Sequence, residues 1–308
     1  MPIQYAEAII YLEELLLKKL LVALKGMIIG GTMMVPGVSG GSMAMILGIY
    51  DELITSVSSF LKHKMKSLIF LLIFVAGALA GMLLFANPLD TLMKKYPLIL
   101  MYFFMGAVAG SIPMMLRKAQ IGKTSANSPP NKKAVKYAVV VLCLAAGVAV
   151  VFLLELLPEG LFSLENNSIS FYLMQLLAGI IAAVALVLPG ISVSHMLLML
   201  GLLEPIYDIL KSGFSTKWFS LIPLAVGLLA GVILTTRILE LSMKNHPTPT
   251  YSIILGFLIG SIIDVFPGLP TGLQIPLCLG LFVVGFALIF ILSKIEEKNE
   301  NEKLTAEN

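Results

Sequence analysis

A short polar break that occurs twice inside apolar sequence restricts the fold of this chain more than any other feature. The first copy spans 35–43 with the sequence VPGVSGGSM, and the second spans 188–196, 153 positions later, with LPGISVSHM. In both copies Pro-Gly interrupts an apolar run, and small hydroxylated residues follow. Inside a membrane, such non-helical backbone is tolerated only where protein or water surrounds it. Two equivalent breaks therefore predict a membrane protein built from two related halves.

Matches between the halves continue beyond the breaks in the same order. They join Leu47-Gly48 with Leu200-Gly201, Asp51 with Glu204, Gly77 and Gly81 with Gly227 and Gly231, Pro97 with Pro247, and Gly106 and Gly110 with Gly256 and Gly260. Glycines four residues apart are common wherever membrane helices pack closely, so each match alone is weak. Their common order, at offsets of 153 and then 150, makes chance a poor explanation. Each half is therefore predicted to contain one broken segment followed by three spans.

Composition supports the membrane setting. Of the 308 residues, 58% are hydrophobic and 13% are charged, against roughly a quarter charged in soluble domains. An ordinary soluble enzyme is excluded, and the net charge of +3 is too small to indicate nucleic-acid binding. We predict an all-α integral membrane protein with six stretches near the length of about 20 apolar residues that a spanning helix needs. These are 67–86, 97–117, 134–157, 218–236, 249–265 and 272–294.

The other segments differ in composition. Residues 1–25 mix Glu and Lys with many leucines, which predicts an amphipathic helix at the membrane surface. The polar stretch 118–133 is typical of a cytoplasmic linker, and the charged residues 296–308 of a disordered tail. The broken segments, 26–60 and 170–212, remain to be placed.

The distribution of basic residues decides the topology. Lysines and arginines gather at 62–66 and 117–136, whereas 155–165 contains three acids and no basic residue. By the positive-inside rule the first two regions are cytoplasmic and the third is external. Because Lys18, Lys19 and Lys25 also favour the cytoplasm, the chain from 26 to 60 must enter and leave the bilayer on one side.

The broken segments are therefore predicted to be re-entrant hairpins. The second one, 170–212, then begins and ends outside, and both termini are cytoplasmic. The expected fold has a first repeat, with a core at 26–133 and a third span at 134–157, and a second, inverted repeat over 158–295. Each repeat holds one broken-helix hairpin and three transmembrane helices.

This geometry gives the breaks a chemical meaning. A helix of about ten residues follows each break, at 41–50 and 194–203, and would cover about 15 Å, half a bilayer. Its N-terminus would lie near the midplane, where free N–H groups attract anions. The candidate anion-binding residues are Pro36, Gly37, Ser39, Gly40, Gly41 and Ser42, with Pro189, Gly190, Ser192, Val193, Ser194 and His195. The alternative is that these residues only shape and cap a kinked hairpin.

Charged side chains near these spans are few. Arg117 and Arg237 fall near predicted cytoplasmic ends, where each either snorkels to lipid head groups or binds the anion directly. His195 stands where the second half-helix begins, which favours anion binding or proton coupling over the alternative of a packed neutral imidazole. Further coupling candidates are the three acids Asp51, Glu204 and Asp264. The first two suit caps of the next short helices better than coupling sites, and Asp264 suits an interfacial cap and a gating group equally.

At this point the sequence resembles a known family. The run 30–42, followed by LGIYD at 47–51, is similar to the signature of bacterial polyprenyl-phosphate transporters, known as undecaprenyl phosphate translocases. The resemblance covers about 25 to 294. It implies return of undecaprenyl phosphate from the outer to the cytoplasmic leaflet of the bacterial cytoplasmic membrane, where the carrier is reused for peptidoglycan and other envelope polymers. It implies no cofactor, and leaves proton or sodium coupling open.

Two other functions are weighed against this one. Membrane phosphatases of undecaprenyl pyrophosphate carry Pro-Gly-x-Ser-Arg-Ser, but Gly40 and Val193 occupy the arginine position here. Segments 26–35 and 179–188 contain no acid, so neither a hydrolytic site nor a metal cluster can be assembled and the chain is not expected to be an enzyme. A secondary transporter of a small soluble anion stays open, because its anion site would look alike.

Overall fold

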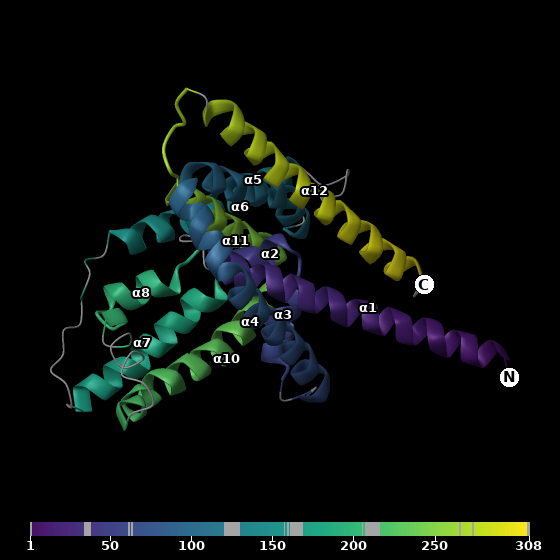
Figure 1. Ribbon diagram of the computed structural model, residues 1–308, viewed down its shortest axis with the longest axis horizontal. Coiled ribbons are helices and arrows are strands. Elements are labelled where there is room, and N and C mark those ends of the chain that lie inside the picture. Colours follow the sequence, from purple (N-terminus) through teal and green to yellow (C-terminus); the bar gives the residue numbers. More distant parts are fainter. Residues whose placement is uncertain are drawn as a thin grey trace.

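The computed structural model describes residues 2–33, 38–60, 62, 64–119, 130–156, 158, 160, 169–204, 206, 216–264, 266–272 and 274–306. These residues form helices and their connections, and no β-strand occurs among them (Figure 1). The predicted all-α class is confirmed.

The two halves contribute similar sets of helices. The first half contains α1 (Pro2–Thr32), α2 (Gly40–Ile46), α3 (Tyr50–Ser58), α4 (Lys64–Lys95), α5 (Pro97–Lys118) and α6 (Pro130–Glu155). The second contains α7 (Ile169–Val187), α8 (Val193–Met199), the 3-10 helix η1 (Thr216–Leu221), α10 (Ile222–Asn245), α11 (Pro247–Asp264) and α12 (Gln274–Ala306). In both halves a short helix follows the break.

Within the described ranges, six helices are long and apolar enough to cross a bilayer. They are Lys64–Lys95, Pro97–Lys118, Ala134–Glu155, Ser170–Val187, Phe219–Asn245 and Gln274–Ile295. The set differs from the predicted one at two places. The apolar part of α11, Pro247–Ile263, is shorter than these six, whereas α7, expected as one limb of hairpin 170–212, runs unbroken because its break comes only at Pro189. The helices indicate a multi-pass membrane protein.

Several predicted boundaries shift in the structure. Helix α1 is continuous through residue 25, where an amphipathic helix was expected to end, because no proline or turn sequence interrupts it. Helix α12 extends through most of the expected tail, 296–308, since this segment is rich in Glu and Lys, which favour helix. Helix α6 starts at Pro130, inside the expected linker, as proline is favoured at a first helical position. Residues 120–129 of that linker lie outside the described part.

One close helix pair occurs in each half. Helix α1 packs along α4, and α7 packs along α10. A Cβ added to Gly77 would lie 2.3 Å from the carbonyl oxygen of Ala23, and one added to Gly227 would lie 2.1 Å from that of Leu176. Positions 77 and 227 are 150 apart, and 23 and 176 are 153 apart. The equivalent contact is thus made twice, at the offsets found in the sequence, because only glycine permits this approach.

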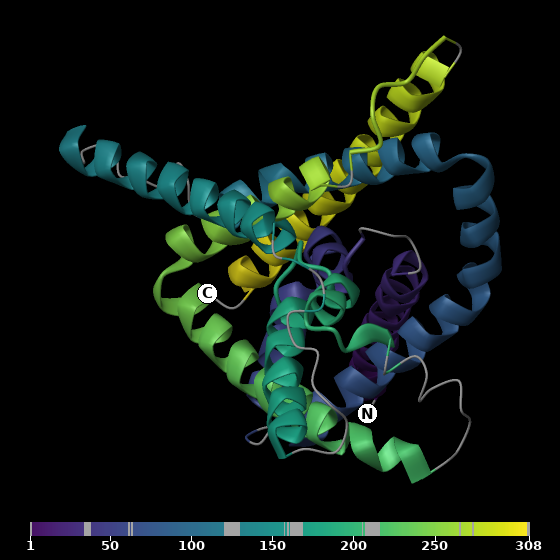
Figure 2. The same ribbon diagram turned by 90° about the vertical axis from the view of Figure 1, so that its left-hand side faces the viewer.

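The other two helix pairs join one half to the other. Helix α5 packs along α12, and α6 along α11. A Cβ on Gly106 would lie 2.0 Å from the carbonyl oxygen of Phe282, and one on Gly256 would lie 2.3 Å from that of Leu144. Figure 2 shows the outer ends of α6 and α12 projecting to opposite sides. Each half therefore supplies one helix to a pair completed by the other half.

The main buried core includes α2, the short helix that follows the first break. Helices α2 and α11 lie at the centre of the bundle, with α5 and α12 on one side and α7 and α10 on the other (Figure 1). Met45, Met115 and Leu258 are fully buried there. The Tyr50 hydroxyl donates to the carbonyl oxygen of Val187 over 2.7 Å and joins α3 to the end of α7. The short helices are thus held inside the bundle, next to both breaks.

Candidate functional site

The first break ends in a serine cap. Residues 34–37, which include the candidates Pro36 and Gly37, lie outside the described residues. Ser39 is extended (φ −85°, ψ 145°), and its Oγ accepts the N–H of Ser42 over 3.0 Å at the start of α2. The first N–H groups of a helix have no carbonyl partner, which explains the serine here. Ser39 Oγ also lies 2.7 Å from Ser42 Oγ.

The two breaks meet. The Gly190 N–H donates to Ser42 Oγ at 2.8 Å and to Ser39 Oγ at 3.2 Å. A Cβ added to Gly41 would lie 3.2 Å from the Cα of Pro189. We call this contact, formed by residues 39–42 and 189–190, the junction. It brings together parts of the two candidate sets that are about half the chain apart.

Gly190 has two reasons to be glycine. Its φ is +86°, in the left-handed region that side chains disfavour. An added Cβ would also lie 2.4 Å from the carbonyl oxygen of Phe257 in α11. Both features occur at the residue whose N–H donates to the two serines.

A hydrogen count at the junction leaves one donor free. Ser39 Oγ accepts from two N–H groups, those of Ser42 and Gly190, which fills both lone pairs of a hydroxyl oxygen. Either hydroxyl could supply the hydrogen between them; when Ser39 is the donor, its oxygen accepts no more than these two bonds. The hydrogen of Ser42 then has no acceptor among the described residues, although Ser42 is only 5% exposed.

The second break also ends in a serine cap. Ser192 caps α8 by accepting the N–H of His195, over a longer distance of 3.4 Å. Val193 starts that helix, and Ser194 follows in it. The His195 Nε2 is buried and has no hydrogen-bond partner among the described residues. An unpaired buried polar atom costs about 1–3 kcal/mol, so this nitrogen is suited to a ligand.

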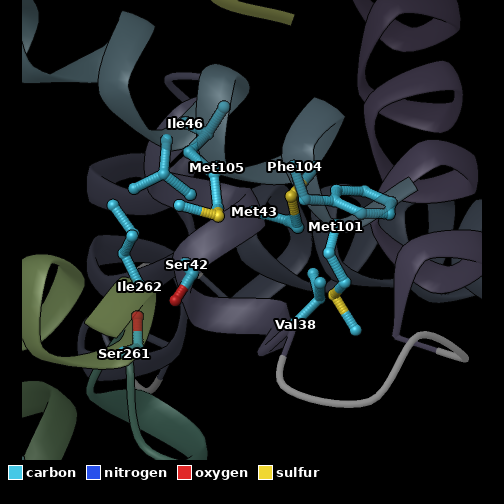
Figure 3. Close-up of a pocket in the computed structure, with 10 residues that line it drawn as sticks. Val38, Ser42, Met43, Ile46, Met101, Phe104, Met105, Ser261 and Ile262 are labelled. Atoms are coloured by element: carbon cyan, nitrogen blue, oxygen red, sulfur yellow. The ribbon is translucent and has the colours of Figure 1, made fainter. Parts of the chain in front are cut away.

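A cavity of about 30 Å³ adjoins the junction at Ser42. Its wall consists of Val38, Ser42, Met43, Ile46, Met101, Phe104, Met105, Val108, Ser261 and Ile262 (Figure 3). Only two of these side chains carry a hydroxyl, and the rest are apolar. The methionines and Phe104 were not among the candidates from the sequence, because nothing local distinguishes them from other core residues.

Among the described residues, neither arginine forms a hydrogen bond with the junction. Arg117 donates to Ser293 Oγ at 2.9 Å and pairs with Glu297 at 3.1 Å, so both of these partners of its guanidinium lie on α12. Arg237 is exposed on α10. The structure does not bring either one to the serines of the breaks.

Asp51 is part of a cluster that sequence reasoning missed. Its Oδ2 accepts from Lys118 Nζ at 2.5 Å and from the Tyr251 hydroxyl at 3.0 Å. Its Oδ1 is buried and has no partner in the described part of the chain. The cluster joins α3, α5 and α11, whose residues are far apart in sequence, so no local pattern announces it.

The other two acids differ from Asp51. Glu204, which matches Asp51 in the repeat, is exposed. Asp264 is the last residue of α11, and its side chain lies outside the description. Among the described residues, no group of three His, Cys, Asp or Glu side chains could hold a metal ion.

Comparison with known proteins identifies relatives over most of the chain. A family model described as undecaprenyl phosphate translocase-like matches residues 29–275. A Staphylococcus aureus protein named polyprenyl-phosphate transporter is 32% identical over 286 residues, which are 90% of this chain and 97% of the relative. A Vibrio cholerae protein of the same name is 28% identical over 276 residues, 82% of each chain.

No solved structure matches the chain significantly. The relatives are named as transporters, not as enzymes, in agreement with the expectation from the sequence. The resemblance noted at 30–51 is thereby confirmed, and the chain belongs to the undecaprenyl phosphate translocase-like family.

Proposed function

We propose that this protein carries undecaprenyl phosphate from the outer to the cytoplasmic leaflet of the bacterial cytoplasmic membrane, so that the lipid carrier is reused for envelope polymers. The names of its relatives support a polyprenyl-phosphate substrate. The observation that carries the proposal is the junction, where two breaks in apolar sequence meet through Ser39, Ser42 and Gly190. A charged head group needs such a polar place within the bilayer, because a charge is costly there, whereas the tail can stay in lipid.

The proposed architecture is a pair of inverted repeats with re-entrant hairpins. The equivalent close contacts of Gly77 and Gly227 support the repeat, and the lysine distribution supports the inversion. Cysteine-accessibility mapping tests it: loop 61–66 is expected to react from the cytoplasm and loop 213–217 from outside. Labelling of both loops from the same side contradicts the inversion.

The proposed phosphate site is centred on the junction. The Ser42 hydroxyl supplies the hydrogen without an acceptor, and the His195 Nε2 supplies the unpaired nitrogen. We include the remaining candidates around both breaks, namely Pro36, Gly37, Ser39, Gly40, Gly41, Pro189, Gly190, Ser192, Val193 and Ser194. The cations Arg117 and Arg237 act on the same phosphate near the cytoplasmic surface, and for Arg117 this requires exchange of Glu297 for phosphate.

For coupling to a proton or sodium gradient, we propose His195 and Asp51 as the first candidates, ahead of the exposed Glu204 and of Asp264. Both carry a buried atom, Nε2 and Oδ1, without a hydrogen-bond partner among the described residues. A buried polar atom without a hydrogen bond costs about 1–3 kcal/mol, and a bound proton or cation would supply the missing partner.

The decisive experiment is reconstitution of the purified full chain in liposomes with labelled undecaprenyl phosphate. Accelerated crossing of the label, changed by a proton or sodium gradient, is the expected result. Absence of crossing, together with uptake of a soluble anion by the same liposomes, would assign the junction to an ordinary anion transporter instead.

A further inference from the structure

We infer that the cavity beside Ser42 is the subsite for the first isoprene units of the transported lipid. The inference rests on the proposed function and extends it, because it assigns the part of the protein that selects a prenyl chain. The wall comes from Val38 and from α2, α5 and α11, so both halves of the chain contribute. The cavity therefore lies where relative movement of the halves would open or close it.

The order of chemical groups along the cavity matches that of a lipid phosphate. Figure 3 shows the hydroxyls of Ser42 and Ser261 together, and Met101 and Phe104 away from them. A prenyl phosphate has the same order, an anionic head followed directly by an apolar chain. A phosphate held at the junction thus leaves its first carbon atoms next to the apolar wall.

The polar end has a donor to offer. When Ser39 is the donor of the bond between the two serine hydroxyls, the hydroxyl hydrogen of Ser42 lacks an acceptor among the described residues, whereas that of Ser261 is donated to the carbonyl oxygen of Leu258 at 2.9 Å. Ser42 is therefore the residue of the wall that can donate to a phosphate oxygen. Hydrogen bonds to an ionised acceptor are about twice as strong as neutral ones.

The apolar wall suits a branched, unsaturated chain. Met43, Met101 and Met105 contribute three thioethers, and Phe104 contributes a ring. Methionine side chains are flexible and polarisable, so they can adapt to the methyl branches and double bonds of isoprene units. At about 30 Å³ the cavity holds water-sized molecules in this structure, and the methionines must swing aside to admit the chain. An inorganic anion gains nothing from such a wall.

Filling the cavity tests the assignment. We would measure equilibrium binding of farnesyl phosphate, a short prenyl phosphate, and of inorganic phosphate to the full chain in nanodiscs. Met105→Trp is the filling variant, and Leu98→Trp is the control, a partly buried residue of the same helix that does not line the cavity. Each buried methylene is worth about fourfold in affinity, so loss of two or three such contacts gives a decrease of at least about tenfold.

The expected result is weaker binding of farnesyl phosphate to Met105→Trp alone, with binding of inorganic phosphate equal in all three proteins. Equal affinity of farnesyl phosphate for Met105→Trp and for the wild type overturns the subsite. A decrease that Leu98→Trp shares also overturns it, because the effect is then not specific to the cavity.

Photolabelling keeps the inference testable if Met105→Trp does not fold. A diazirine analogue of farnesyl phosphate is expected to label wild-type peptides that contain 101–108 or 38–46, and labelling confined to other helices contradicts the subsite. Flipping of undecaprenyl phosphate is scored separately. Wild-type protein that binds farnesyl phosphate in the cavity but does not flip the lipid refutes the proposed function and leaves the subsite standing.

Discussion

Replacement of Ser42 by alanine separates the two roles of its hydroxyl at the junction. As an acceptor, Ser42 Oγ holds the Gly190 N–H at 2.8 Å. That N–H keeps its longer bond of 3.2 Å to Ser39 Oγ in the variant, but the bond between the two hydroxyls is also lost, so the expected loss of stability is about 1–3 kcal/mol, the net value of two hydrogen bonds. As a donor, the hydroxyl would form a charge-assisted bond to phosphate worth about 1.5–3 kcal/mol, which corresponds to about 10- to 150-fold in affinity.

The assay is equilibrium binding of farnesyl phosphate together with thermal unfolding in the same detergent. Ser252→Ala is the matched control, since Ser252 is fully buried in α11 and its hydroxyl donates to the carbonyl oxygen of Thr248 at 2.7 Å. We expect both variants to unfold at slightly lower temperatures and only Ser42→Ala to lose affinity. Affinity of Ser42→Ala within about threefold of wild type, less than one neutral hydrogen bond is worth, would refute the free-donor reasoning.

Two further changes test the second break. Gly190→Ala is expected to lower the stability by about 3 kcal/mol or more, because the cost of a positive φ and the cost of a clash with the Phe257 carbonyl add together. The control is Gly268→Ala, at φ +90° with open space around it, which should cost only about 1–2 kcal/mol. Equal unfolding temperatures of the two variants would contradict the packing argument. His195→Ser removes the buried Nε2 that has no partner among the described residues. We expect this variant to bind farnesyl phosphate at least about tenfold more weakly, the value of one charge-assisted hydrogen bond, and wild-type affinity of the variant would make His195 a packing residue.

Part of this fold could be predicted because close helix packing leaves a mark in the sequence. Gly26 and Gly77 line the contact of α1 with α4, and Gly179 and Gly227 line the equivalent contact of α7 with α10. A helix that approaches another backbone tolerates no side chain at such positions, so the repeat of glycines records the repeat of contacts. The long apolar stretches could likewise be recognised in the sequence, since their length reflects the thickness of the bilayer.

The sequence could not reveal which helices of one half pack against helices of the other half. The pairing of α5 with α12 and of α6 with α11 uses the same kind of glycine contact as a pairing within one half would. For the same reason the cluster of Asp51, Lys118 and Tyr251 was missed, because each residue alone is consistent with a cap, a snorkelling cation or an interfacial ring. The lengths of the apolar stretches also gave a wrong expectation at α7 and α11. Because α11 is buried between other helices, it does not need a full-length apolar span.

The two breaks match in sequence but not in hydrogen bonding, and this difference bears on how a phosphate would enter. At the first break, Ser39 and Ser42 bond to each other and to Gly190, which leaves a single free hydrogen. At the second, the hydrogen bond that caps α8 is longer, at 3.4 Å, and His195 Nε2 has no partner among the described residues. An incoming anion therefore finds a fixed partner on the side of α2 and an adaptable one on the side of α8. If movement of one half relative to the other accompanies transport, the two bonds from the Gly190 N–H to the serines would have to change, because they join the two halves, whereas the cap of α8 lies within the second half.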